Sequence, residues 1–137
     1  MKILVSLVTV FTLFLSNGTS TEKQTITATV VNVTSDSGKV YFSLYNKEDF
    51  MKKPLQTASA IVKDGKSTVV FKGVESGEYA IICYHDKNSN NKMDFAPNGR
   101  PMENYGSSNN VMTMGPPQFD TAKFIVADKN VSFDIKF

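Results

Sequence analysis

The stretch Gln24-Thr25-Ile26-Thr27-Ala28-Thr29-Val30 alternates polar and apolar side chains at every position. Successive side chains of a β-strand point to opposite faces, so Ile26, Ala28 and Val30 would share one face and the threonines the other. This pattern predicts a first strand over residues 24–34, with one face in a core and the other in solvent.

The same alternation recurs downstream, and no long helical periodicity interrupts it. It predicts further strands at residues 40–45, 57–63, 69–71, 78–86, 119–126 and 131–137. Asp64-Gly65 predicts a tight hairpin, and Asp128-Lys129-Asn130 predicts a second hairpin between the last two strands. Seven short strands separated by polar turns predict an all-β fold, a single antiparallel seven-stranded β-sandwich with one long loop.

Residues 1–20 have the features of a secretory signal peptide. Lys2 gives a positive start, residues 3–15 are mostly apolar, and Gly18 and Ser20 fit the small residues of a cleavage site. The apolar segment is too short for a membrane-spanning helix. We therefore expect cleavage after Ser20, export to the periplasm or the extracellular space, and one β-sandwich domain over residues 21–137.

The composition excludes several function classes. Fifteen Lys and Arg against thirteen Asp and Glu give a net charge of +2, which is too weak for nucleic-acid binding. Cys83 is the only cysteine, so an exported chain has no internal disulfide. We expect a monomer without a membrane span and without nucleic acid, whose partner is a protein, a glycan or a small ligand.

A loop with metal-ligand spacing follows the strand at 78–86. Oxygen-bearing side chains recur there at alternate positions, in Asp86, Asn88, Asn90 and Asp94. Calcium loops take ligands from positions 1, 3, 5, 7 and 9, and position 7 uses its backbone carbonyl. Lys92 occupies that position, so we predict a Ca²⁺ site at Asp86, Asn88, Asn90, Lys92 and Asp94.

The loop departs from an EF-hand. Position 6 is Asn91 where Gly is usual, and position 12 is Pro97 where a bidentate Glu is usual. Asn tolerates the left-handed backbone better than other non-glycine residues. Glu103 could close the coordination shell from further along the chain. A weak site is expected, on the order of 10⁻⁴–10⁻³ M. The alternative is an Asn/Asp/Ser turn cluster that binds no ion, since these residues favour turns on their own.

Several motifs resemble known families. The run from Phe71 to Ile81, with Gly73 and then Gly77-x-Tyr79, resembles a hairpin of transthyretin-like sandwiches. The whole of residues 24–137 resembles the bacterial domain of unknown function 2141, which implies a small exported sandwich and no established activity. That resemblance rests on Leu44-Tyr45, Lys53-Pro54-Leu55, Tyr84-His85-Asp86, Gly99-x-Pro101-x-Glu103-x-Tyr105-Gly106-x-Ser108-Asn109-Asn110 and Gly115-Pro116-Pro117-x-Phe119.

The chain departs from this family's pattern at two positions. Asn91 stands where a glycine is usual, and Ser107 stands where an aromatic residue is usual. The first departure bears on the ion site and the second on what packs beneath Tyr105. The implied fold remains a transthyretin/immunoglobulin-like sandwich.

Cys83 and His85 are the nearest approach to a catalytic pair. They lie on one face of the same predicted strand, where residues i and i+2 are about 6.5–7 Å apart. A nucleophile and its base need about 2.6–3.2 Å. We expect Cys83 to pack in the core and His85 to cap the strand end. The sequence therefore predicts no enzyme.

Methionines give the best alternative function. Met93, Met102, Met112 and Met114 fall in the long segment that follows His85. Thioether and imidazole ligands can hold Cu(I), which would make this a periplasmic copper-handling protein. Methionines also fill irregular gaps beneath loops, which is the structural alternative.

Residues 105–110, Tyr-Gly-Ser-Ser-Asn-Asn, combine an aromatic ring with hydroxyls and amides. This composition is typical of adaptable recognition loops, so we expect the segment to form the exposed rim of a partner site. The alternative is a structural brace in which Asn109 and Asn110 hydrogen-bond nearby backbone.

Overall fold

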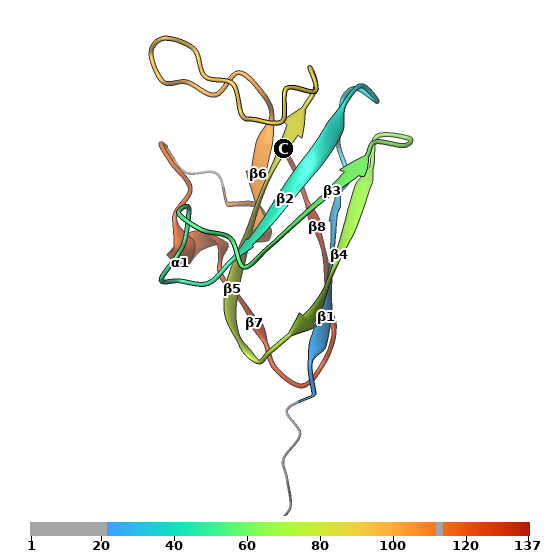
Figure 1. Cartoon of the computed structure of the whole chain (residues 1–137), viewed down its shortest axis with the longest axis vertical. Coiled ribbons are helices and arrows are strands. Elements are labelled where there is room, and N and C mark those ends of the chain that lie inside the picture. The colour runs from blue at the N-terminus through green and yellow to red at the C-terminus, as the bar shows by residue number, and fades with distance from the viewer. Residues whose placement is uncertain (1–21, 112–113) are drawn as a thin grey trace, which may run out of the picture.

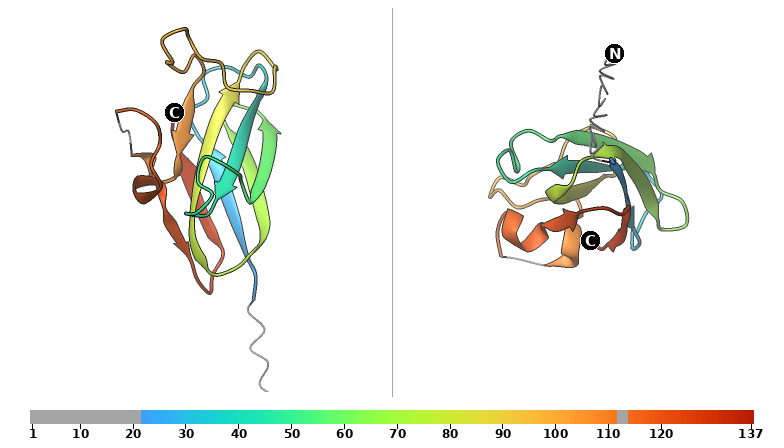
Figure 2. Two further views of the ribbon diagram at one scale, coloured as in Figure 1. Left: turned by 60° about the vertical axis from the view of Figure 1, so that its left-hand side comes forward. Right: turned by 90° about the horizontal axis from the view of Figure 1, so that it is seen from below.

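Two β-sheets pack face to face (Figures 1 and 2) in the computed structural model, which describes residues 22–111 and 114–137. The smaller sheet has the order β4-β1-β8, and the larger has the order β3-β2-β5-β6 with β7 also paired to β5. Their bounds are β1 Gln24–Val30, β2 Lys39–Tyr45, β3 Gln56–Ile61, β4 Ser67–Val74, β5 Gly77–Asp86, β6 Tyr105–Ser107, β7 Phe124–Val126 and β8 Val131–Ile135. The predicted signal peptide lies outside the described residues.

The core follows from the alternation. Ile26, Ala28 and Val30 of β1 are fully buried, while Thr27 and Thr29 between them are half-exposed. From the facing sheet, Phe42 and Leu44 of β2 meet them in one apolar cluster. Each such side chain stabilises the fold by about 1.5–3 kcal/mol when it leaves water. The prediction of an all-β sandwich is confirmed.

The Asp64-Gly65 hairpin is confirmed in detail. Asp64 has φ 53° and Gly65 has φ 73°, so both lie in the left-handed region that a two-residue hairpin requires. Lys63 and Lys66 exchange backbone hydrogen bonds across it at 2.9 and 3.0 Å. The turn also accounts for the end of β1 at Val30, because Val33 donates its N–H to the Gly65 carbonyl instead of continuing the sheet.

Three predictions near the C-terminus are wrong. The strand count is eight, because Tyr105–Ser107 forms β6 inside the predicted loop, followed by the 3₁₀ turn η1, Ser108–Asn110. Phe119–Ala122 is a helical turn, α1, and only Phe124–Val126 is a strand. Asp128–Asn130 is no hairpin, because β7 pairs with β5 whereas β8 crosses to the other sheet and pairs with β1 in parallel.

Side-chain alternation shows which face of a strand is buried, but it does not name the strand's partner. This explains why the individual strands were predicted better than their pairing. In the described part of the chain, no helix has the length and apolar character needed to span a membrane.

One end of the sandwich carries the predicted metal loop. Figure 1 shows the segment between β5 and β6 projecting beyond the ends of the strands, near the C-terminus. The loop before β2 supports it closely: a Cβ at Gly38 would lie 1.9 Å from the carbonyl oxygen of Asp86. The chain therefore requires glycine at residue 38, where φ is also 72°.

Candidate metal-binding loop

The ion loop, residues 86–94, is anchored by Asp86 at the end of β5. The Asp86 side chain is buried, and its Oδ1 accepts a hydrogen bond from the backbone N–H of Asn90 at 3.1 Å. Its Oδ2 accepts one from the backbone N–H of Asn91 at 2.8 Å. The Asp86 carboxylate thus fixes the turn by accepting hydrogen bonds from backbone N–H groups further along the loop, as Asp commonly does at the first position of a turn.

Three of the other predicted ligands, Asn88, Asn90 and Asp94, contact one another. Asn88 Nδ2 donates to Asp94 Oδ2 at 2.8 Å, and Asn90 Nδ2 donates to both Asp94 oxygens at 2.7 and 2.8 Å. These hydrogen bonds, from Asn88 first and then Asn90, lower the pKa of Asp94 because they favour its charged form. The alternate spacing therefore does bring these side chains together.

Left-handed residues produce the tight curl of the loop. Ser89 has φ 59° and Asn91 has φ 62°. Asn91 therefore adopts the conformation for which glycine is usual, at lower cost than most side chains. Its Oδ1 accepts a 2.5 Å hydrogen bond from the Tyr41 hydroxyl, which ties the loop to β2. Lys92, the predicted carbonyl ligand, donates its N–H to Asn90 Oδ1 at 3.2 Å.

Glu103 joins this group from the far end of the projecting segment. Its Oε2 accepts a hydrogen bond from the backbone N–H of Asp94 at 3.3 Å. Its Oε1 is buried and has no hydrogen-bond partner among the described residues. Burial raises the pKa of Glu103 and the carboxylates of Asp94 and Asp86 add to that rise, whereas the backbone N–H groups of Asp94 and Lys87 oppose it.

The donor set is rich in amides. In the described ranges 22–111 and 114–137, no three His, Cys, Asp or Glu side chains form a group that could hold a metal ion. The carboxamides of Asn88 and Asn90 would have to supply oxygen ligands, and both now direct Nδ2 toward Asp94. A half-turn of each carboxamide exchanges its nitrogen for its oxygen and would present two neutral ligands.

A model of the family described as "Uncharacterized protein conserved in bacteria (DUF2141)" matches residues 28–134. The chain belongs to this family. The match confirms the family resemblance seen in the sequence motifs, and the two packed sheets agree with the sandwich expected for a DUF2141 protein. Comparison with curated proteins and with solved structures finds no match.

A tyrosine row lies beside the ion loop of this DUF2141 chain, and it was not predicted. Tyr41, Tyr84 and Tyr105 occupy one cross-strand row on β2, β5 and β6. The rings of Tyr41 and Tyr84 stack with centroids 5.4 Å apart. Burial raises the pKa of Tyr84, and the Asp86 carboxylate raises it further. Predicting this row would require the register between paired strands, and the alternation of polar and apolar residues within one strand does not give that register.

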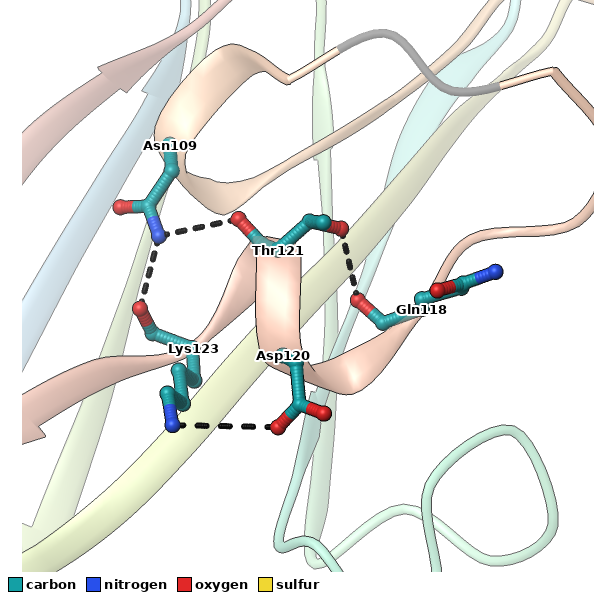
Figure 3. Close-up of polar contacts among 5 residues, drawn as sticks. All are labelled: Asn109, Gln118, Asp120, Thr121 and Lys123. Atoms are coloured by element: carbon teal, nitrogen blue, oxygen red, sulfur yellow. Dashed lines mark hydrogen bonds and ion pairs between the residues drawn. The ribbon is translucent and has the colours of Figure 1, made fainter.

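Residues 108–110 form the structural brace that was the alternative prediction for this segment of the DUF2141 chain, although Asn109 and Asn110 stay exposed. Ser108 is fully buried, and its Oγ contacts the backbone of Ile81 and Ala122. Asn109 Nδ2 donates to the carbonyls of Thr121 at 3.2 Å and Lys123 at 2.7 Å, as Figure 3 shows. Thr121 in turn donates to the Gln118 carbonyl and Lys123 pairs with Asp120, so α1 is held at both ends.

Asn110 completes the brace. Its Nδ2 donates to the Asp134 carbonyl at 3.0 Å, and its Oδ1 accepts from the Lys136 N–H at 2.7 Å. A side-chain amide thus replaces a neighbouring strand along the outer edge of β8. Within the predicted rim, Tyr105 and Ser107 are half-exposed and Asn109 and Asn110 are exposed, although both asparagine amides bond to backbone.

The polar groups of β5 are engaged in internal contacts. His85 is buried, its Nε2 lies 2.6 Å from the Ser37 carbonyl oxygen, and its ring stacks on Phe137. The thiol of Cys83 is buried 3.6 Å from the Gly106 carbonyl oxygen, and burial raises its pKa. Both residues therefore occupy the positions expected for core packing and strand capping.

The methionines of the copper alternative differ in their surroundings. Met93 is half-buried, whereas Met102 and Met114 are exposed, and Met112 lies outside the described residues. A copper ion at His85 Nε2 would have to displace the Ser37 carbonyl. The copper-handling role stays a prediction, and no contact of the described residues favours it.

Proposed function

We propose that this DUF2141 protein is an exported, non-enzymatic binding or structural module whose ion loop holds Ca²⁺ weakly. The observation that carries the proposal is the buried Oε1 of Glu103, which has no hydrogen-bond partner among the described residues and belongs to a carboxylate beside Asp94 and Asp86. Leaving such an acceptor unsatisfied costs about 1–3 kcal/mol or more when it is charged.

A bound Ca²⁺ would remove that cost and the repulsion among the carboxylates. It prefers oxygen ligands and takes six to eight of them. The loop and Glu103 contain carboxylates, carboxamides and a main-chain carbonyl of the kinds that Ca²⁺ binds. The proposed ligand residues are Asp86, Asn88, Asn90, Lys92, Asp94 and Glu103.

The affinity should be low. Both carboxylate oxygens of Asp86 already accept hydrogen bonds from backbone N–H groups. The Asn88 and Asn90 amides must break their hydrogen bonds to Asp94 before they can coordinate Ca²⁺. Rearranging these contacts reduces the free energy gained on binding. We therefore expect a Kd on the order of 10⁻⁴–10⁻³ M.

A binding role, not catalysis, suits the remaining polar groups. His85 and Cys83 are buried and bonded to backbone carbonyls, so neither is available as a base or a nucleophile. The half-exposed tyrosine row beside the ion loop is the surface that we assign to a protein, glycan or small-ligand partner.

Calcium titration by calorimetry, with thermal melts in EDTA and in about 5 mM Ca²⁺, tests the proposal. A calcium concentration ten times Kd stabilises the fold by about 1.4 kcal/mol. For a domain of this size that is a rise in Tm of roughly 4–8 °C. Glu103→Gln keeps the shape of the side chain and should weaken calcium binding at least about tenfold. Equal melting temperatures in both buffers, with no heat of binding, would refute it.

Asp86→Ala is a poor ligand-removal test by itself. The Asp86 carboxylate also holds the backbone of Asn90 and Asn91, so its loss would disorder the loop even if no ion binds. Mg²⁺ provides the specificity control, because it requires shorter and more regular octahedral coordination. We expect Mg²⁺ to produce a smaller shift in Tm than Ca²⁺.

A further inference from the structure

The ion loop continues directly into a narrow ribbon, residues 94–102, which we call the finger. Met102 donates its N–H to the Asp94 carbonyl and Ala96 donates to the Arg100 carbonyl, both at 2.8 Å. Gly99, at φ 80°, turns the chain between them. In Figure 1 the finger belongs to the yellow-to-orange segment that extends past the ends of the strands.

The finger presents large apolar side chains to solvent. Phe95 is 59% exposed and Met102 is 69% exposed, although both flank an ordered turn. Phe95 pairs with Pro101 across the ribbon, so these apolar residues lie together at one place. Phe95 is the one phenylalanine of the described residues that is exposed, and it lies beside a second exposed apolar side chain, which points to a contact surface.

Unpaired positive charges surround the apolar residues. Lys87, Lys92 and Arg100 are exposed. The only ion pair within the described residues joins Lys123 to Asp120, so none of these three cations is neutralised by direct contact. The opposing carboxylates nearby belong to the ion loop and to Glu103, and those are the groups that we propose bind Ca²⁺.

The charge balance around the finger therefore depends on the ion. Without it, three cationic side chains at this end of the molecule balance three carboxylates, those of Asp86, Asp94 and Glu103. Bound Ca²⁺ adds two positive charges and turns this end of the molecule into a basic surface around an apolar centre. Such a surface is complementary to anionic lipid headgroups lying over acyl chains.

We propose that the finger docks onto an anionic lipid bilayer when Ca²⁺ occupies the ion loop, with Phe95 and Met102 entering the headgroup region. This inference rests on the proposed calcium site. A bilayer fits better than a protein partner because a stable protein interface needs about 800 Å² on each side. A narrow ribbon with two exposed apolar side chains offers much less area, but it can insert.

Vesicle co-sedimentation tests the inference, using phosphatidylcholine vesicles with and without phosphatidylglycerol, in Ca²⁺ or in EDTA. The test variant is Phe95→Ser/Met102→Ser. The matched control is Ile125→Ser, which removes a side chain of similar exposure, 70%, from β7. Calcium calorimetry on each protein separates ion binding from lipid binding.

We expect the wild type and Ile125→Ser to sediment with phosphatidylglycerol vesicles in Ca²⁺ only. Phe95→Ser/Met102→Ser should bind these vesicles at least about tenfold more weakly while its calcium affinity is unchanged. Calcium binding without vesicle binding would overturn the inference and leave the proposed function standing. Equal vesicle binding by the wild type and Phe95→Ser/Met102→Ser would also overturn it. Absence of calcium binding would refute the proposed function, and this inference with it.

Discussion

The carboxylate of Glu103 is fastened to the backbone of Asp94, with Oε2 3.3 Å from the Asp94 nitrogen. A residue outside the ion loop thus closes it, in place of the glutamate that an EF-hand carries at position 12. The same contact places the finger between two residues of one polar cluster, so ordering the cluster also orders the finger.

The pH dependence of the calcium-free protein should reveal Glu103. Its pKa is raised in the fold by burial and by Asp94 and Asp86, so the folded state holds the proton more tightly than the unfolded chain. This contribution to stability is fully present below the unfolded pKa of about 4.3 and is lost as pH rises through the folded pKa. In EDTA, Glu103→Gln should therefore gain stability over the wild type near neutral pH. Melts across pH 4–7 would detect this, and a constant difference would contradict it.

Asp94→Asn should act in the opposite direction at low pH. The Asn88 and Asn90 amides lower the pKa of Asp94, so its contribution is present above the unfolded pKa of about 3.9 and is lost as pH falls through the folded value. The variant should lose this part of the acid dependence and also bind calcium at least about tenfold more weakly. Calcium titration followed by NMR measures both; an unchanged affinity would remove Asp94 from the ligand set.

Gly38→Ala should destabilise the fold far more than Gly99→Ala. Both glycines have positive φ, at 72° and 80°, so both variants carry a backbone cost of about 1 kcal/mol. Only Gly38 faces another atom, since its Cβ would meet the Asp86 carbonyl at 1.9 Å, whereas nothing lies within 4 Å of Gly99. Urea denaturation should show a loss of at least about 3 kcal/mol for Gly38→Ala. Equal losses of stability in the two variants would show that the backbone around Gly38 moves to accommodate the added Cβ at little cost.

Asn110→Ala should cost about 1–3 kcal/mol, because it leaves the Asp134 carbonyl and the Lys136 N–H without their partner. Asn98→Ala is the control, since Asn98 makes one exposed contact to the Arg100 N–H at the tip of the finger. Hydrogen exchange at Lys136 should accelerate in Asn110→Ala alone. Unchanged protection of the Lys136 N–H in Asn110→Ala would mean that the Asn110 side chain does not take the place of a neighbouring strand beside β8.

Met114→Leu tests the copper alternative. Met114 is fully exposed, so the variant should leave stability unchanged. If His85 and the methionines handle Cu(I), this change should weaken Cu(I) binding in a competition assay. We expect no effect, because His85 Nε2 is already bonded to Ser37. Tight Cu(I) binding that falls in Met114→Leu would favour the copper role.

Local chemistry predicted much of this molecule from the sequence. The period-2 alternation identified the buried faces of the strands through β5, and Asp64-Gly65 identified its hairpin, because both signals depend on near neighbours in the chain. The alternate polar positions likewise place Asn88 and Asn90 beside Asp94, whereas the calcium site stays a prediction.

Long-range pairing was beyond the same signals. The sequence of Val131–Ile135 does not indicate that its parallel partner is β1, near the other end of the chain. The sequence of Phe119–Ala122 is compatible with a helical turn and also with a strand that has one apolar face. Glu103 was a possible ligand by its chemistry, but its buried oxygen is visible only in three dimensions. The tyrosine row likewise depends on strand register.

The parallel pairing of β1 with β8 has a consequence for how the protein is made. β1 is the central strand of its sheet, and the partner on one side of it lies among the final residues of the chain. During synthesis that edge of β1 stays open until Val131–Ile135 has been made, so the smaller sheet cannot be completed before then.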